Sequence, residues 1–205
     1  MNTIHIGFDT ETTGIPEMLG YKKFYNPKDI YKYNTSRMVQ LAYQIYNSDM
    51  TKLLDEKNYL IKPNGFVHMN TEFHGITYEK ALKEGRELKD VLNEFLLDIT
   101  NYSKHFQVFL FGHNVDFDIN VTASELHRTG NIEGATFLST VQKRCTMELS
   151  RNIVKKEIIL KTGRKAIKDP SLKEAFEFFT KEVITNQHDA LYDVKNTSRI
   201  YKYLI

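Results

Sequence analysis

The N-terminal half of the chain carries short apolar patterns that predict β-strands. Residues 3–9 alternate between apolar and polar types and end in an acidic cluster, so we expect a first strand with chemical groups at its C-terminal end. Residues 38–46 and 53–62 are rich in β-forming residues, and the turn-forming residues 47–50 between them favour a hairpin. Residues 107–112 form a short apolar run that is typical of a buried strand.

Helical spacing of apolar residues predicts the remaining elements. We expect helices over 87–101, from about 117 to 129 with a stop at Gly130, over 170–181, and from about 188 to 204. The first of these carries one apolar face, made of Leu88, Val91, Leu92, Phe95, Leu96 and Ile99. Strands come first and then alternate with helices, which predicts an α/β fold with a mixed sheet of about five strands flanked by helices.

Length and composition limit the alternatives. A chain of 205 residues is expected to form a single domain, and a net charge of +2 says little about partners. Cys145 is the only cysteine, which excludes an internal disulfide and a cysteine-rich zinc site. Neither a signal peptide nor an apolar run of membrane-spanning length is evident, so we expect an intracellular, most simply cytoplasmic, protein without membrane contact.

Three acidic clusters hold the candidate chemistry. Asp9 and Glu11 follow the first strand, Asp118 follows the strand at 107–112, and His188 and Asp193 lie near the C-terminus. Asp9 and Glu11 are two residues apart and so point to the same side of a strand. Each cluster alone fits an ordinary strand end, a helix N-terminus or a surface histidine. Together they supply the oxygen ligands that hard divalent cations prefer, and two such ions catalyse phosphodiester hydrolysis.

These motifs resemble the DEDDh branch of the DnaQ-like 3′–5′ exonucleases, which have a ribonuclease H-like fold. Asp9 and Glu11 match the first motif of that family and Asp118 matches the second. The third motif corresponds to the pair His188 and Asp193, in its histidine form.

The resemblance continues between the motifs. Residues 38–42 are similar to the family's second strand, and His74-Gly75-Ile76-Thr77 is similar to its His-Gly-Ile-Thr segment. Residues 145–147 and 170–174 resemble segments of Trex-like and large-virus members.

The resemblance implies a role for each of the five motif residues. Asp9 is expected to bridge two divalent cations. Mg²⁺ is the expected ion, and Mn²⁺ is the alternative. Glu11 and Asp193 complete the site of the ion that holds the attacking water, and Asp118 supports the second ion through water. His188 acts as general base, and the ordinary pKa of histidine, about 6.5, suits that task at neutral pH.

Substrate contacts are also implied. The backbone of Thr12 and Thr13 is expected to contact the 3′-terminal nucleotide. Asn114 is also expected among the substrate-binding residues. Its main role, shared with His113, is expected to be ordering the second motif. His74 either contacts the same nucleotide or serves as a turn or cap histidine, and the sequence leaves both interpretations open.

Two segments depart from the commonest family pattern. Residues 15–36 contain Pro16 and Pro27 and predict a long surface connection that could cover the site. Residues 143–168 hold nine Lys or Arg against two Glu, so this basic insertion either contacts a polyanion backbone or is a solvated loop. Apolar residues on both sides of Thr162-Gly163 predict a hairpin within it.

The resemblance therefore implies a metal-dependent 3′–5′ exonuclease. It would act on single-stranded or frayed DNA ends and release nucleoside 5′-monophosphates. The alternatives are an RNA 3′-end exonuclease or oligoribonuclease and a proofreading subunit bound to a polymerase. The expected partners are nucleic acid and, as a protein partner, a polymerase or a second copy of the chain. A binding module without catalysis is disfavoured, because all four carboxylates and the histidine are present.

Overall fold

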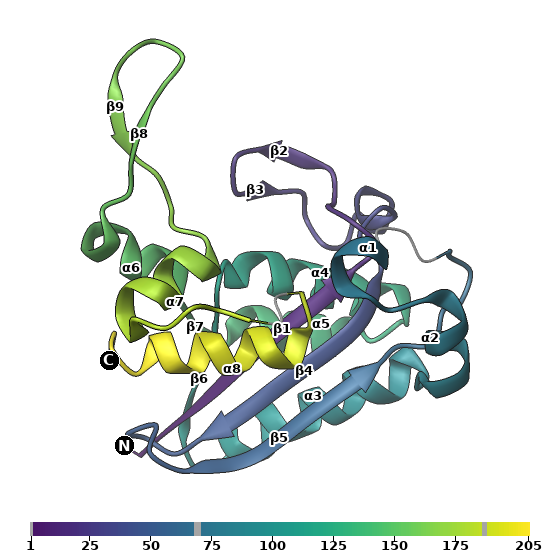
Figure 1. The fold of residues 1–205 in the computed structure, drawn as a ribbon. Coiled ribbons are helices and arrows are strands. Elements are labelled where there is room, and N and C mark those ends of the chain that lie inside the picture. The colour runs from purple at the N-terminus through teal and green to yellow at the C-terminus, as the bar shows by residue number, and fades with distance from the viewer. Residues whose placement is uncertain (1, 68–70, 186–187) are drawn as a thin grey trace.

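A mixed five-stranded sheet forms the centre of the protein in the computed structural model, which describes residues 2–67, 71–185 and 188–205 (Figure 1). The strand order is β5-β4-β1-β6-β7. β1 runs antiparallel to β4 and parallel to β6, while β5 and β7 are the outer strands. The bounds are Thr3–Thr12 for β1, Met38–Tyr46 for β4, Leu53–Leu60 for β5, Gln107–Gly112 for β6 and Gln142–Cys145 for β7.

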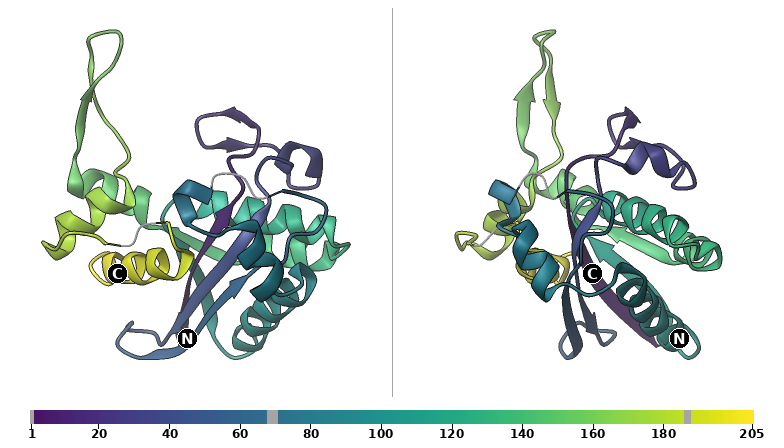
Figure 2. Two further views of the ribbon diagram at one scale, coloured as in Figure 1. Left: turned by 45° about the vertical axis from the view of Figure 1, so that its right-hand side comes forward. Right: turned by 90° about the vertical axis from the view of Figure 1, so that its right-hand side faces the viewer.

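Helices cover both faces of this sheet (Figures 1 and 2). α3, α4 and α5 lie on one face, and α8 lies across the other with α6 and α7 beside it. The short helices α1 and α2 lie near the N-terminal end of β4. The bounds are Thr71–His74, Tyr78–Glu84, Leu88–Ser103, Val115–Arg128, Ile132–Thr140, Thr146–Val154, Leu172–Thr180 and Ala190–Tyr201 for α1 to α8. Within the described ranges, none of these helices combines the length and apolarity needed to cross a bilayer.

The two-residue period of β1 distributes its side chains between the two layers. Ile4, Ile6 and Phe8 enter the large core beneath α3 and α4. On the opposite face Gly7 lies against Phe111, whose ring stacks on α8. The same alternation sends Thr10 toward α4, and Asp9 and Glu11 toward α8. β1 thus presents polar groups to both layers at its C-terminal end.

Two small β-structures project from the body on the same side of the molecule (Figures 1 and 2). The connection at 15–36 forms an arm with strands β2 (Met18–Gly20) and β3 (Lys23–Phe24), followed by the 3₁₀ helix η1 (Ile30–Tyr33). The second is the hairpin of β8 (Glu157–Ile159) and β9 (Lys165–Ile167).

The observed elements confirm the α/β class, the mixed sheet and the hairpin at 158–167. The helix expected from 117 begins two residues earlier, and the one expected over 188–204 is shorter, spanning Ala190–Tyr201. Residues 143–168 are not one continuous surface segment, because they include most of β7, all of α6 and the hairpin. α1, α2, α5, α6 and β7 were not expected from the apolar pattern.

Gly7 provides a test of this packing. A Cβ added at Gly7 would lie 2.5 Å from Cζ of Phe111, whose ring stacks on Tyr201 at 4.2 Å between centroids. Gly7→Ala should therefore lower the free energy of unfolding by about 1–3 kcal/mol, because overpacking displaces this aromatic pair. Urea titration measures the change. Gly20→Ala, where the added Cβ has its nearest neighbour at 3.8 Å, should stay within about 0.5 kcal/mol of the parent. Equal stabilities of the two variants would contradict the packing account.

Candidate metal-dependent nuclease site

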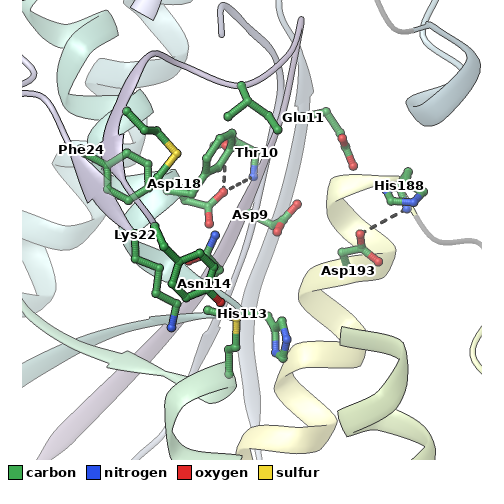
Figure 3. Close-up of a pocket in the computed structure, with 15 residues that line it drawn as sticks. Asp9, Thr10, Glu11, Lys22, Phe24, His113, Asn114, Asp118, His188 and Asp193 are labelled. Atoms are coloured by element: carbon green, nitrogen blue, oxygen red, sulfur yellow. Dashed lines mark hydrogen bonds between the residues drawn. The ribbon is translucent and has the colours of Figure 1, made fainter. Parts of the chain in front are cut away.

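The five motif residues line one cavity at the C-terminal end of β1 (Figure 3). The cavity has a volume of about 510 Å³. Figure 3 shows the Asp9 carboxylate between that of Asp118 on one side and those of Glu11 and Asp193 on the other. Residues that are up to 184 positions apart in the chain (193 − 9) therefore meet at one point.

Asp118 is fixed by the residue between the two acids of the first motif. The backbone N–H of Thr10 donates to Oδ1 of Asp118 at 3.0 Å, and the Thr10 hydroxyl donates to the same oxygen at 2.8 Å. Both residues are buried. Because Thr10 points to the α4 side of the sheet, β1 binds one carboxylate on that side and presents its own two on the other.

The turn from β6 into α4 is held by two residues of the second motif. Asn114 has a φ of 69°, which asparagine tolerates better than most residues, and it lines the cavity. Burial lowers the pKa of His113 to about 4, so its ring is neutral at physiological pH. Its Nε2–H donates to the Pro170 carbonyl at 2.9 Å, and Nδ1 lies 3.0 Å from the Thr146 hydroxyl. These contacts agree with an ordering role for His113.

The third motif is positioned by the start of α8. Asp189 caps the helix by accepting two backbone N–H groups, and the Ala190 N–H donates to Oε1 of Gln40 on β4 at 3.1 Å. The His188 N–H donates to Oδ2 of Asp193 at 3.2 Å. The other Asp193 oxygen, Oδ1, is buried and has no hydrogen-bond partner in the described chain. A buried acceptor without a donor is costly, and a cation would satisfy it.

Glu11, His188 and Asp193 form a group suited to a metal ion. One possible ligand atom from each residue lies within 4.8 Å of the others. Carboxylate oxygens with one imidazole nitrogen suit a divalent cation. The free Oδ1 of Asp193 and the adjacent Asp9 carboxylate support the same conclusion, so the donor set fits the metal ions implied by the sequence.

Burial and mutual repulsion perturb all four carboxyl groups. Burial raises the pKa of Asp9 well above its ordinary value, and the negative charges of Asp118 and Asp193 add to that rise. Burial also raises the pKa of Glu11 to about 8, again with help from Asp193. The pKa values of Asp118 and Asp193 are raised chiefly by burial, against the hydrogen bonds that they accept. The cavity therefore favours either bound protons or bound cations.

The predicted substrate contacts lie in different places. Thr12 and His74 line a hollow next to Glu11 and His188, while Asn114 lines the main cavity. His74 also accepts the Ile76 N–H at Nδ1 (3.1 Å), so it has the turn role as well as a place near the site.

Thr13 lies apart from both hollows. Its backbone N–H donates to the Arg37 carbonyl at 2.9 Å, and its hydroxyl donates to the Thr35 carbonyl at 3.1 Å. The side chain lines a separate surface hollow instead of the acidic cavity. Of the Thr12–Thr13 pair, only Thr12 therefore reaches the acidic centre.

Several cavity residues were not expected from the sequence. Phe73 is 61% exposed and its ring meets the His188 ring edge-on, with 6.2 Å between centroids. Tyr21, Lys22 and Phe24 of the arm line the main cavity. Phe73 directly precedes the His-Gly-Ile-Thr segment, so its position in the sequence could have identified it as a site residue. The arm residues carry no recognisable motif.

The model of the Exonuclease family (RNase_T) matches residues 6–201. The chain belongs to this family. No curated protein matches it by sequence. The match confirms the resemblance to the DnaQ-like exonucleases and places the chain in a family of nucleases.

Solved structures of exonuclease I share the fold. A product-bound form is 17% identical with a TM-score of 0.68, covering 98% of this chain and 43% of that one. E. coli exonuclease I with a dT13 oligonucleotide is 18% identical with a TM-score of 0.69, covering 98% and 40%. Its zinc-bound complex with single-stranded DNA is 20% identical with a TM-score of 0.67, covering 98% and 40%. The chain thus spans about two fifths of exonuclease I, and the likeness confirms a ribonuclease H-like fold.

The raised carboxyl pKa values predict a pH-dependent stability. In chelator, the four carboxyl groups of the cavity bind more protons in the folded protein than in the unfolded chain between the ordinary carboxyl pKa, about 4, and the Glu11 value of about 8. Stability should therefore fall as pH rises through this window. Mg²⁺ should restore it increasingly at higher pH, because binding displaces those protons. Thermal melting at several pH values, with Mg²⁺ or EDTA, measures both effects.

Glu11→Gln should flatten the pH dependence in EDTA, since it removes one of the perturbed groups. Glu79→Gln, an exposed change on α2, should leave it as in the parent. A melting temperature in EDTA that stays constant or rises from pH 5 to 8 would contradict the electrostatic account.

Proposed function

We propose that the chain is a 3′–5′ exonuclease that hydrolyses single-stranded or frayed DNA ends with the help of two divalent cations. The observation that supports this most strongly is the convergence of Asp9, Glu11, Asp118, Asp193 and His188 on one cavity, within a fold and family of nucleases. Release of nucleoside 5′-monophosphates is part of the proposal.

The carboxylates would hold the cations. Asp9 occupies the central position and would contact both ions, while Glu11 and Asp193 would bind the first and Asp118 would support the second. When bound, such ions stabilise the attacking and leaving oxygens of a phosphodiester. Mg²⁺ fits the oxygen-rich donor set, and Mn²⁺ is the alternative.

His188 would accept the proton of the attacking water. It is exposed at the cavity, directly before the residue that caps α8, and its backbone N–H donates to the Asp193 carboxylate. The edge-on contact with Phe73 restricts the orientation of its ring. Because its ring nitrogen also lies within reach of Glu11 and Asp193, direct metal ligation is the competing role for this side chain.

A strand with a free 3′ end suits this cavity. Asn114 in its wall, and Thr12 and His74 in the adjoining hollow, would contact the terminal nucleotide. The solved relatives include exonuclease I bound to dT13 and dA16 oligonucleotides, which favours DNA here by analogy. An RNA exonuclease with the same centre is the second candidate, because a ribonucleotide 3′ end differs from a deoxyribonucleotide end only in its 2′-hydroxyl.

Digestion of end-labelled strands tests the proposal. Single-stranded DNA with a 5′ label should yield a ladder that shortens from the 3′ end, and a 3′ label should be released as mononucleotide. Mg²⁺ or Mn²⁺ should support the reaction and EDTA should stop it. Matched RNA should be digested more slowly. Asp9→Ala and Asp193→Ala should each lower the rate by about 10³-fold or more, because each removes a ligand of the catalytic cations.

Asp116→Asn is the matched control, since Asp116 is two residues from Asp118 but pairs with Lys143 and does not line the cavity. It should retain nearly the parent rate. A variant at Asp9 or Asp193 that digests DNA like the parent would disprove the site, and faster digestion of RNA would replace the substrate assignment.

The role of His188 is tested by pH. His188→Ala should reduce the rate strongly near neutral pH and recover partly at higher pH, where hydroxide replaces the missing base. Rate against pH, measured at saturating Mg²⁺, separates the two roles. If the variant instead needs much more Mg²⁺ and shows no recovery with pH, His188 is a metal ligand.

A further inference from the structure

Positive charge without ion-pair partners gathers on the β8–β9 hairpin and at Lys155, the residue that caps the end of α6 just before it. Within 155–168, Lys165 pairs with Glu157 at 3.2 Å, and Lys156 and Lys168 both pair with Glu174, at 3.5 and 2.8 Å. For the other three cations, no ion pair forms with any residue that the structure describes; these are Lys155, Lys161 and Arg164. All three side chains are exposed.

The basic residues before the hairpin are engaged in the body of the protein. Lys143 pairs with Asp116, and Arg144 lies over the Phe109 ring at 4.8 Å. Arg151 donates to the Ile167 carbonyl at 3.0 Å. Within residues 143–168, the positive charge that is free to bind an anion therefore lies mainly at the hairpin.

The hairpin is an ordered projection. Its strands pair from Glu157–Ile167 to Ile159–Lys165, and the turn closes through Gly163, whose φ is 78°. Ile159 is 75% exposed on it, next to the free cations. The exposed cations give a surface that suits the phosphates of an unpaired strand.

The base of the hairpin is fixed to the wall of the acidic cavity. Asp169 follows β9 and pairs with Lys22 at 2.9 Å, and it accepts the Tyr21 hydroxyl at 2.8 Å. Lys22 and Tyr21 both line the cavity. Figures 1 and 2 show the hairpin and the arm rising on the same side of the molecule. A strand that left the cavity past Lys22 and Tyr21 would run toward the base of the hairpin.

We propose that the β8–β9 hairpin binds the sugar–phosphate backbone of single-stranded nucleic acid upstream of the end held in the cavity. Lys155, Lys161 and Arg164 make the phosphate contacts. This inference rests on the proposed function and adds a determinant of strand length: a strand too short to leave the cavity gains nothing from the hairpin, while a longer one binds more tightly.

Binding of fluorescent oligothymidylates of about four and about 20 nucleotides, followed by anisotropy in EDTA, tests the inference without hydrolysis. The parent should bind the longer strand at least about tenfold more tightly. The triple variant Lys155→Glu, Lys161→Glu, Arg164→Glu should lose most of that advantage and bind the short strand as before. Its salt dependence for the long strand should fall by about 0.7 in logarithmic slope for each lost phosphate contact.

A charge-matched control is Lys83→Glu, Lys89→Glu, Lys104→Glu. These exposed lysines lie on α2 and α3 or at the end of α3, far from the hairpin in both figures. The control should keep the parent's length advantage. Circular dichroism checks that both triple variants are folded.

Two outcomes would overturn the inference. One is an unchanged length advantage in the hairpin variant, which would leave the hairpin as a protein-docking or purely solvated element. The other is an equal loss of the length advantage in the control variant, which would show that the loss follows from the change in net charge and not from the hairpin. Failure of the proposed function is seen separately, as absence of digestion by a parent protein that still binds the longer strand through the hairpin.

Discussion

Repulsion between buried carboxylates is the constraint that the rest of the structure depends on. Burial raises the pKa of Asp9 well above its ordinary value, and the charges of Asp118, Asp193 and Glu11 beside it raise it further. Such an arrangement is unfavourable without a counter-charge, so the surrounding fold must hold it in place. Two hydrogen bonds from Thr10 restrain Asp118, and Gln40 fixes the start of the helix that bears Asp193. The scaffold keeps together groups that would otherwise separate, which leaves the cavity ready for divalent cations.

The sheet achieves this from both of its faces. β1 points Phe8 and Thr10 to the α4 layer, while Asp9 and Glu11 point to the α8 layer. Each layer contributes one helix-borne carboxylate, and the end of the strand is where the two layers meet. The neutral ring of His113 joins the second motif to Thr146 and Pro170, so the C-terminal third of the chain is attached to the same point.

The sequence predicted those parts whose signal is local. The alternation of β1, the β-forming residues of β4 and the helical face of α3 are each carried by neighbouring residues. The acidic motifs were assigned from their order along the chain and their resemblance to a known family. β7 was missed because Gln-Lys-Arg-Cys has no apolar alternation and is a strand only through pairing with β6. The engagement of Thr13 by Arg37 and the contact of Phe73 with His188 join segments distant in sequence, so local patterns could not reveal them.

The hairpin enters and leaves the body at one place. Lys168 donates its backbone N–H to the Lys156 carbonyl at 3.0 Å, so the two ends of the excursion are adjacent, and Glu174 pairs with both side chains while also capping α7. An insertion or deletion between these ends alters the length of the projection without moving the layers beneath it, because loop length has only a weak thermodynamic cost. The hairpin is therefore an exchangeable module. Its length and charge can be changed without altering any residue that lines the acidic cavity.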